Sequence, residues 1–121
     1  MYIYFLQCSG NYKIGVAENV EKRIRVLQVG NPHEITLSFS YHFPEKHHAF
    51  RMEKIFHEAF KKLSRRGEWF SLDDNCIVLS KGILESMSNN DKETMMIYTN
   101  DLADYLGIDH LLPVAGGKAN G

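Results

Sequence analysis

The hydrophobic and polar positions of this chain follow two periods, one of two residues and one of three to four. Residues 2–7, 12–16 and 35–43 alternate between two faces and are rich in β-branched and aromatic residues, a pattern typical of strands. The letters CSGN between the first two stretches are typical of a tight turn. The pattern therefore predicts a hairpin over residues 2–16 and a third strand at 35–43.

The longer period predicts helices between and after these strands. Val20, Ile24 and Leu27 form one apolar stripe over residues 20–29, with Asn19 as the expected N-cap and GNP as the stop signal. A second helix is expected to run from Pro44 to about Leu63. Its apolar stripe consists of Ala49, Met52, Phe56, Ala59, Phe60 and Leu63.

The remainder of the chain predicts a further extended segment and more helix. The sequence GEWFSL at 67–72 is expected to be a short strand or extended segment, and residues 75–87 and 99–106 to be two short helices. The fold class is thus α/β, of the α+β kind, with a small three-stranded, mainly antiparallel sheet flanked by helices. We expect one unit over residues 1–72 and a helical C-terminal extension over 73–121, with frayed last residues.

The composition indicates the general class of protein but not its function. At 121 residues, with 44% hydrophobic and 24% charged residues, the chain is typical of a small globular protein. Its formal net charge is only −1, but basic residues cluster at 21–25 and 61–66 and acidic residues at 85–109. Clustered charge, rather than the sum, is what a nucleic-acid partner requires.

Several sequence features indicate the cellular location of the protein. The chain has no apolar run long enough to span a membrane, and its start lacks the charged region of a signal peptide. The two cysteines, Cys8 and Cys76, are too few and too far apart for a disulfide scaffold. We therefore expect a cytoplasmic protein with reduced thiols and no membrane partner.

A few polar residues stand at unexpected positions in these patterns. Glu53 lies at the border of the apolar stripe of its helix, with His57 one turn below it on the same side. Such a carboxylate is either paired with a basic residue or placed at a functional site. Arg23 flanks the stripe of its own helix and suits a phosphate or a carboxylate equally.

The strands and the histidines leave further alternatives open. Tyr2 and Tyr4 share one face of their strand, where tyrosines are usually core aromatics. Lys13 shares a face with Gly15, and a lysine there is either a surface charge or a reactive group. The six histidines lack the spacing of a zinc site, so zinc is a weak interpretation. Trp69 is expected to be a core aromatic that closes the sheet edge.

The order of these residues resembles the GIY-YIG nuclease superfamily. The resemblance rests on YIY at 2–4, KIG at 13–15, the run EKRIRVLQVGNP, the Glu53/His57 helix and GEWF at 67–70. It covers residues 2–72 and is closer to the phage, bacterial and fungal branch, in which the second motif reads K-I-G.

The resemblance implies hydrolysis of a phosphodiester bond in nucleic acid, DNA being the expected substrate, with one divalent metal ion. In that reading Glu53 holds Mg²⁺ or Mn²⁺, Arg23 binds the phosphate and Tyr4 orients or deprotonates water. A cationic Lys13 stabilises charge on the phosphoryl oxygens, and His57 is a further candidate for proton transfer.

The chain departs from the family pattern at three positions. Tyr2 replaces the first glycine, Lys13 the second tyrosine, and Leu27 a histidine that many members carry. Two classes of function therefore stay open, a metal-dependent endonuclease and an inactive nucleic-acid- or protein-binding module on the same fold. The sequence shows no targeting domain, so we expect low sequence specificity or specificity supplied by a protein partner.

Overall fold

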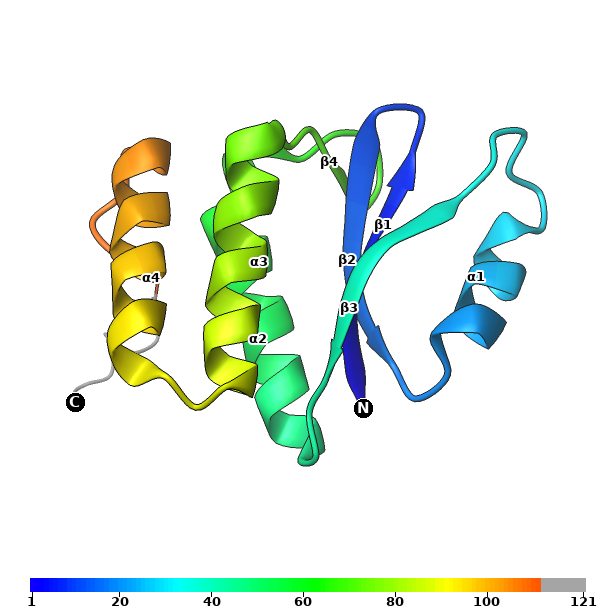
Figure 1. Ribbon diagram of the computed structural model, residues 1–121. Helices are drawn as coiled ribbons and strands as arrows, with labels where there is room; N and C mark the ends of the chain where they lie inside the picture. Colours follow the sequence, from blue (N-terminus) through cyan, green and yellow to red (C-terminus); the bar gives the residue numbers. More distant parts are fainter. Residues whose placement is uncertain (112–121) are drawn as a thin grey trace.

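The structure is a computed structural model in which residues 1–111 are described (Figure 1). The predicted fraying of the last residues lies outside this range. In chain order the elements are β1 (Tyr2–Cys8), β2 (Asn11–Ala17), α1 (Val20–Gln28), β3 (Thr36–His42), α2 (Lys46–Ala59), the 3₁₀ turn η1 (Lys61–Leu63), β4 (Trp69–Phe70), α3 (Asp74–Ser88) and α4 (Lys92–Leu106). The predicted α+β class with an antiparallel sheet and a C-terminal helical part is confirmed.

The sheet has the strand order β3-β1-β2-β4, and all neighbouring strands are antiparallel. The predicted hairpin is confirmed, and its turn places both Ser9 (φ 50°) and Gly10 (φ 82°) in the left-handed region. Two successive left-handed residues match the twist of an antiparallel pair. The described residues form four strands rather than the expected three, because Trp69–Phe70 pairs with β2 at the sheet edge.

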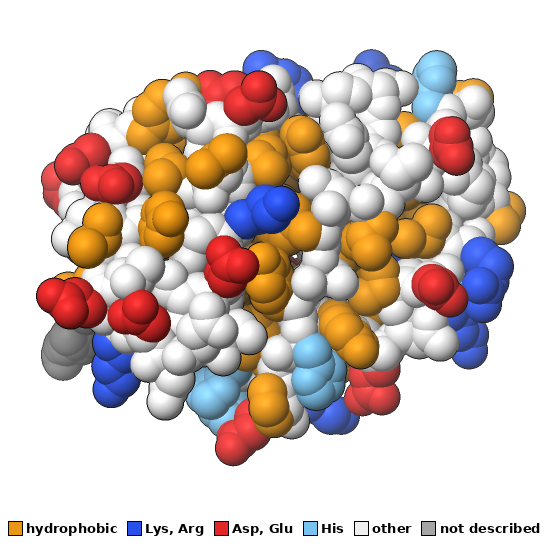
Figure 2. Space-filling view, viewed as in Figure 1, with side chains coloured by type: hydrophobic (Ala, Val, Ile, Leu, Met, Phe, Trp, Pro, Cys, Tyr) orange, Lys and Arg blue, Asp and Glu red, His pale blue; other side chains and the backbone are white. Residues whose placement is uncertain are grey.

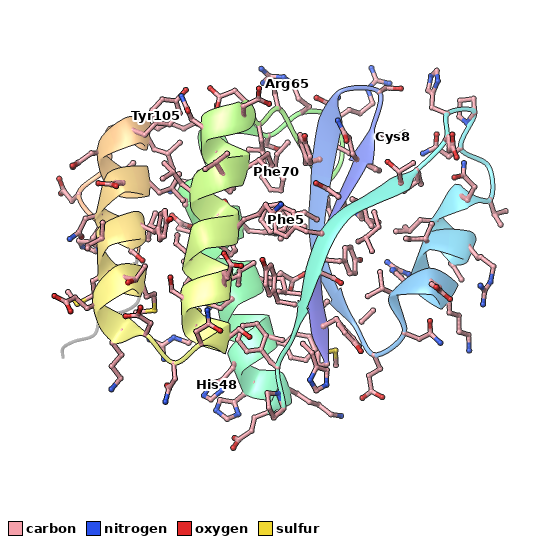
Figure 3. The ribbon with its side chains drawn as sticks, in the orientation of Figure 1. Phe5, Cys8, His48, Arg65, Phe70 and Tyr105 are labelled. Atoms are coloured by element: carbon pink, nitrogen blue, oxygen red, sulfur yellow. The ribbon has the colours of Figure 1, made fainter. Side chains whose placement is uncertain are left out.

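Helices cover the two faces of the sheet unequally (Figure 1). Helix α1 lies alone on one face, α2 and α3 lie on the other, and α4 packs on the far side of α3. Figure 3 shows Phe5 and Phe70 in the layer between the sheet and the helix pair, where they belong to the larger core cluster. The smaller cluster lies under α1 and is built from Tyr4, Leu6, Cys8, Val20 and Ile35.

Local sequence signals set the helix boundaries. Some of the observed boundaries differ from the predicted ones. The side chain of Asn19 caps α1 as predicted, because it accepts a hydrogen bond from the Lys22 backbone. Helix α2 begins at Lys46 and ends at Ala59, so the expected stretch to Leu63 is finished by the 3₁₀ turn. Helix α4 begins at Lys92, well before the predicted start at residue 99.

Helix α3 begins at Asp74, next to residue 73, where the sequence predicts that the chain divides into two units. Its buried residues Cys76, Ile83 and Leu84 belong to the same core cluster as the sheet residues and α2. The boundary between 1–72 and 73–121 stays a prediction. Within the described part of the chain, no helix is long and apolar enough to cross a membrane.

Candidate functional site

The outer edge of β2 is where the predicted site residues gather. Strand β4 pairs with β2 only at Tyr12 and Lys13, so the rest of that edge, residues 14–17, has no strand partner among the described residues. His57 of α2 takes part of the place of a strand, since its Nε2 lies 2.8 Å from the Ile14 carbonyl oxygen. A carbonyl oxygen only accepts, so Nε2 carries the hydrogen, and Nδ1 of a neutral ring is left as an acceptor.

Lys13 is a nearly buried cation on the α1 side of this edge. Its residue is 8% exposed, and its Nζ donates a hydrogen bond to Glu68 Oε1 at 2.8 Å. The same ammonium lies 5.8 Å from the centroid of the Trp69 ring. Lys13 and Trp69 are register partners in the β2–β4 pair, so the strand pairing itself sets this arrangement. The ammonium is thus held by one carboxylate and one aromatic face.

Glu53 stands one helical turn before His57 on α2 and is partly buried. Burial raises the pKa of its carboxyl group and nearby Glu68 raises it further, whereas the charges of His57 and Lys13 lower it. Among the described residues, neither a hydrogen bond nor an ion pair engages this carboxylate. The sequence left open that Glu53 is a boundary glutamate paired with a basic residue. The described residues contain no such pair.

The donor set around Glu53 fits a hard divalent cation. Mg²⁺ and Mn²⁺ prefer carboxylate and water oxygens and are commonly held by one or two protein carboxylates. The described residues contain no group of three or more His, Cys, Asp or Glu that could hold a metal ion. An ion at this edge would therefore depend on the Glu53 carboxylate, with water and phosphate oxygens completing its coordination.

Arg23 and Tyr4 approach the same edge from the α1 side of the sheet. Arg23 is exposed on α1, and its charge contributes to lowering the pKa of Glu68, after the stronger effect of the Lys13 hydrogen bond. Tyr4 is 2% exposed and lies opposite Gly15 in the hairpin. A Cβ atom on Gly15 would stand 2.3 Å from the Tyr4 hydroxyl oxygen, so the ring tip passes directly over this glycine.

Two carboxyl groups connect these residues: the charges of His57 and Lys13 lower the pKa of Glu53, and those of Lys13, His57 and Arg23 lower the pKa of Glu68. Tyr4 differs from these four because apolar side chains surround its ring. That all five act on one substrate stays a prediction. A hollow of about 270 Å³ opens beside the group and is lined by His57, Lys61, Ser64, Gly67, Glu68 and Phe70.

Two residues of the GEWF segment have roles that the sequence did not predict. The sequence indicates no partner for Glu68, and it predicts Trp69 to be a core aromatic that closes the sheet edge. Trp69 is partly buried against the α1-side cluster, and its ring also faces the Lys13 ammonium. A larger apolar hollow of about 370 Å³ between α2, α3 and α4 contains none of the predicted site residues.

Comparison with known proteins identifies the family. Residues 1–88 match the model of the T5orf172 domain, which covers β1 through the whole of α3. Comparisons with curated proteins and with solved structures gave no match. The matched range includes every residue of the group at the β2 edge, and it extends beyond the 2–72 range of the sequence resemblance. The chain belongs to the T5orf172 domain family, a GIY-YIG-related family of nuclease-like domains.

Proposed function

We propose that this chain is a metal-dependent endonuclease that hydrolyses phosphodiester bonds in DNA at the outer edge of β2. The observation that carries the proposal is the partly buried Glu53 carboxylate, which no described residue binds and on which the charges of His57 and Lys13 act, in a domain of a nuclease-like family. We place the chain in the K-I-G branch of the GIY-YIG-related enzymes because Lys13 precedes Ile14 and Gly15.

Glu53 is the residue that would hold Mg²⁺ or Mn²⁺. A bound divalent ion neutralises phosphate charge and polarises water. Lys13, with its ammonium fixed by Glu68, adds a positive charge beside the phosphoryl oxygens, where charge builds up during hydrolysis. Arg23, exposed on α1, has the planar donor geometry that grips a phosphate from the other side.

His57 and Tyr4 are the candidates for handling the proton of the attacking water. The bond between His57 Nε2 and the Ile14 carbonyl fixes the ring and leaves Nδ1 available as an acceptor. An imidazole is suited to this role because its ordinary pKa lies near neutral pH. The Tyr4 hydroxyl, which lies over Gly15 of β2, would orient the water from the α1 side.

The distribution of charge supports DNA as the substrate. Residues 1–72 carry eleven Lys and Arg against seven Asp and Glu, whereas residues 73–121 carry three against eight. The basic residues of α1, which include Lys22, Arg23 and Arg25, are exposed, as are those of the turn after α2, which include Lys61 and Arg65. On the face shown in Figure 2, acidic side chains are denser over the α4 side of the molecule, although some also lie near α1.

Both basic clusters reach the proposed site. The charge of Arg23 acts on Glu68, and Lys61 lines the same hollow as Glu68 and His57. Phosphate contacts of this kind supply affinity without sequence preference. DNA would therefore cross the β2 edge between α1 and the turn after α2.

One observation favours the alternative, an inactive binding module on the same fold. The Lys13 ammonium is nearly buried and already paired with Glu68, so a phosphate reaches it only if that pair adjusts. A module of this kind would bind nucleic acid through its basic clusters and would not cleave it.

The test is incubation of the purified chain with supercoiled plasmid, linear duplex DNA and RNA, each with Mg²⁺, Mn²⁺ or EDTA. We expect the chain to nick or cut plasmid in the presence of either metal and to leave it intact in EDTA. Binding without cleavage in both metals would support the inactive module. Full cleavage in EDTA would contradict a role for Glu53 as a metal ligand.

A further inference from the structure

Two valines are exposed on the solvent side of α1. Val26 is 56% exposed, and Val29, the C-cap residue of the helix, is 82% exposed. They stand one turn apart, since the Val29 backbone N–H donates a hydrogen bond to the Val26 carbonyl oxygen. The solvent side of a surface helix normally carries polar residues, so two neighbouring valines there point to a contact with another molecule.

Basic side chains lie next to these valines. Residues three and four positions apart are neighbours on a helix, so Lys22 and Arg25 flank Val26 and Val29. Both basic residues are exposed, and no ion pair engages either of them among the described residues. These four residues, which we call the α1 outer face, combine positive charge with apolar contact surface. That combination is complementary to a nucleic-acid groove, where charged phosphates flank the base edges.

The α1 outer face is open to a partner of that size. Helix α1 lies alone on its side of the sheet (Figure 1), and its opposite stripe, Val20, Ile24 and Leu27, packs in the smaller core cluster. The helix has nine residues and is therefore about 14 Å long. The major groove of B-DNA, about 12 Å wide, admits an α-helix.

The α1 outer face also adjoins the proposed cleavage site. Arg23, the proposed phosphate ligand, lies one turn before Val26 at one border of the face, whereas Glu21 lies toward the other border. A duplex whose backbone contacts Arg23 would present its base edges to the two valines. Valine side chains form no hydrogen bonds, and thymine is the base that offers an apolar group in the major groove, its C5-methyl.

We propose that the α1 outer face reads thymine in the major groove of duplex DNA, with Val26 and Val29 against the C5-methyl groups and Lys22 and Arg25 on the flanking phosphates. This inference rests on the proposed function, because it requires that the chain binds DNA on the α1 side of the β2 edge. It adds a preference for thymine next to the cut. Two apolar contacts give only a modest preference, which agrees with the low sequence specificity expected from the sequence.

The test compares duplexes that differ only in methyl groups. Short duplexes that bind the parent chain best are selected from a random-sequence pool in EDTA, where we expect no cleavage. Their affinities are then measured by fluorescence anisotropy, once with thymine and once with uracil, which lacks the C5-methyl group.

The proteins are the parent chain, a double variant with Val26→Ser and Val29→Ser, and Val78→Ser. Val78 is 60% exposed on α3, so Val78→Ser is a matched control for the loss of an exposed valine away from α1. Thermal unfolding verifies that each variant is folded. The comparison of thymine with uracil on the parent chain needs no variant, so it tests the inference even if the double variant does not fold.

We expect uracil to weaken binding by the parent chain about fourfold for each contacted thymine, the effect of one lost methyl contact. The double variant should bind the two duplexes equally, whereas Val78→Ser should discriminate between them as the parent does. Arg25→Ala should weaken binding to both duplexes alike, because a phosphate contact carries no sequence information.

Several results would overturn the inference, and they are distinguishable from failure of the proposed function. Equal affinity of the parent chain for both duplexes, or a double variant that still discriminates, would mean that α1 does not read thymine, while the proposed cleavage stands. A parent dimer that the double variant converts to a monomer in sedimentation would assign the valines to a protein interface instead. No binding of any duplex by the parent chain would overturn both this inference and the proposed function.

Discussion

We predict that the KIG motif needs glycine at position 15 because the ring of Tyr4 occupies the space that a side chain would take there. Replacing Gly15 tests this prediction directly. Gly15 and Tyr4 face each other across the β1–β2 hairpin. A Cβ atom at position 15 would stand 2.3 Å from the Tyr4 hydroxyl oxygen and 2.6 Å from its Cζ atom. These separations are far shorter than van der Waals contact. Because the φ of Gly15 lies outside the left-handed region, any penalty for Gly15→Ala comes from this clash and not from the backbone.

The size of the penalty follows from how tightly Tyr4 is held. Tyr4 is 2% exposed and packs among Leu6, Val20 and other members of the smaller core cluster under α1. Its ring therefore cannot rotate into solvent. An added methyl group in a well-packed core typically costs about 1–3 kcal/mol. For a domain of this size that corresponds to a fall in Tm of roughly 4–12 °C.

The assay is thermal unfolding followed by circular dichroism, with Gly15→Ala made in three backgrounds. With Tyr4→Leu the ring is gone, and the penalty should shrink below about 0.5 kcal/mol. With Tyr4→Phe most of the penalty should remain, because the Cζ atom still clashes. An unchanged Tm for Gly15→Ala, or the same penalty in all three backgrounds, would refute this reasoning.

Three further predictions follow from the charges and burial of named groups. If the chain is an enzyme, Lys13→Ala should lower single-turnover cleavage by at least about a hundredfold while DNA binding in a filter assay falls far less; equal cleavage by parent and variant would make Lys13 a structural charge. Burial raises the pKa of Glu53 in the folded chain above its value in the unfolded chain. The free energy of unfolding therefore falls as the pH rises from the unfolded-state pKa through the folded-state pKa. Urea unfolding should therefore show Glu53→Gln to be more stable than the parent at pH 7 and equal to it at about pH 3; a less stable variant at pH 7 would contradict this sign. Burial also raises the pKa of the Cys76 thiol to about 11, so in a Cys8→Ser background a thiol reagent at pH 8 should modify Cys76 only as fast as the chain opens, and rapid modification of the folded chain would contradict it.

The elements that the sequence predicted well are those with local signals. The alternation at residues 2–16 and the SG turn define the hairpin, and the Asn19 cap with its apolar stripe defines α1. The predicted helix over 99–106 is too short at its start: residues 92–94 belong to a polar stretch that indicates a break, and the prediction leaves out the apolar residues 95–98 after them. There Asp91 caps the helix by accepting a hydrogen bond from the Thr94 backbone.

What the sequence left open depends on contacts between distant residues. The sequence indicated a short strand or extended segment at residues 67–72, but no local pattern revealed that Trp69–Phe70 pairs with β2. The ion pair between Lys13 and Glu68 joins positions 55 residues apart through that pairing. Glu53 and His57, by contrast, could be placed together from helical spacing alone, since they are one turn apart.

The central claim is that the Glu53 carboxylate at the β2 edge supports metal-dependent cleavage of DNA. Its most direct measurement is single-turnover cleavage of plasmid in Mn²⁺ by the parent chain and by Glu53→Gln, at enzyme concentrations that saturate DNA binding for both. The account predicts cleavage by the parent chain and none by Glu53→Gln, although the variant stays folded and binds DNA at least as tightly. Cleavage by Glu53→Gln at the parent rate would contradict it.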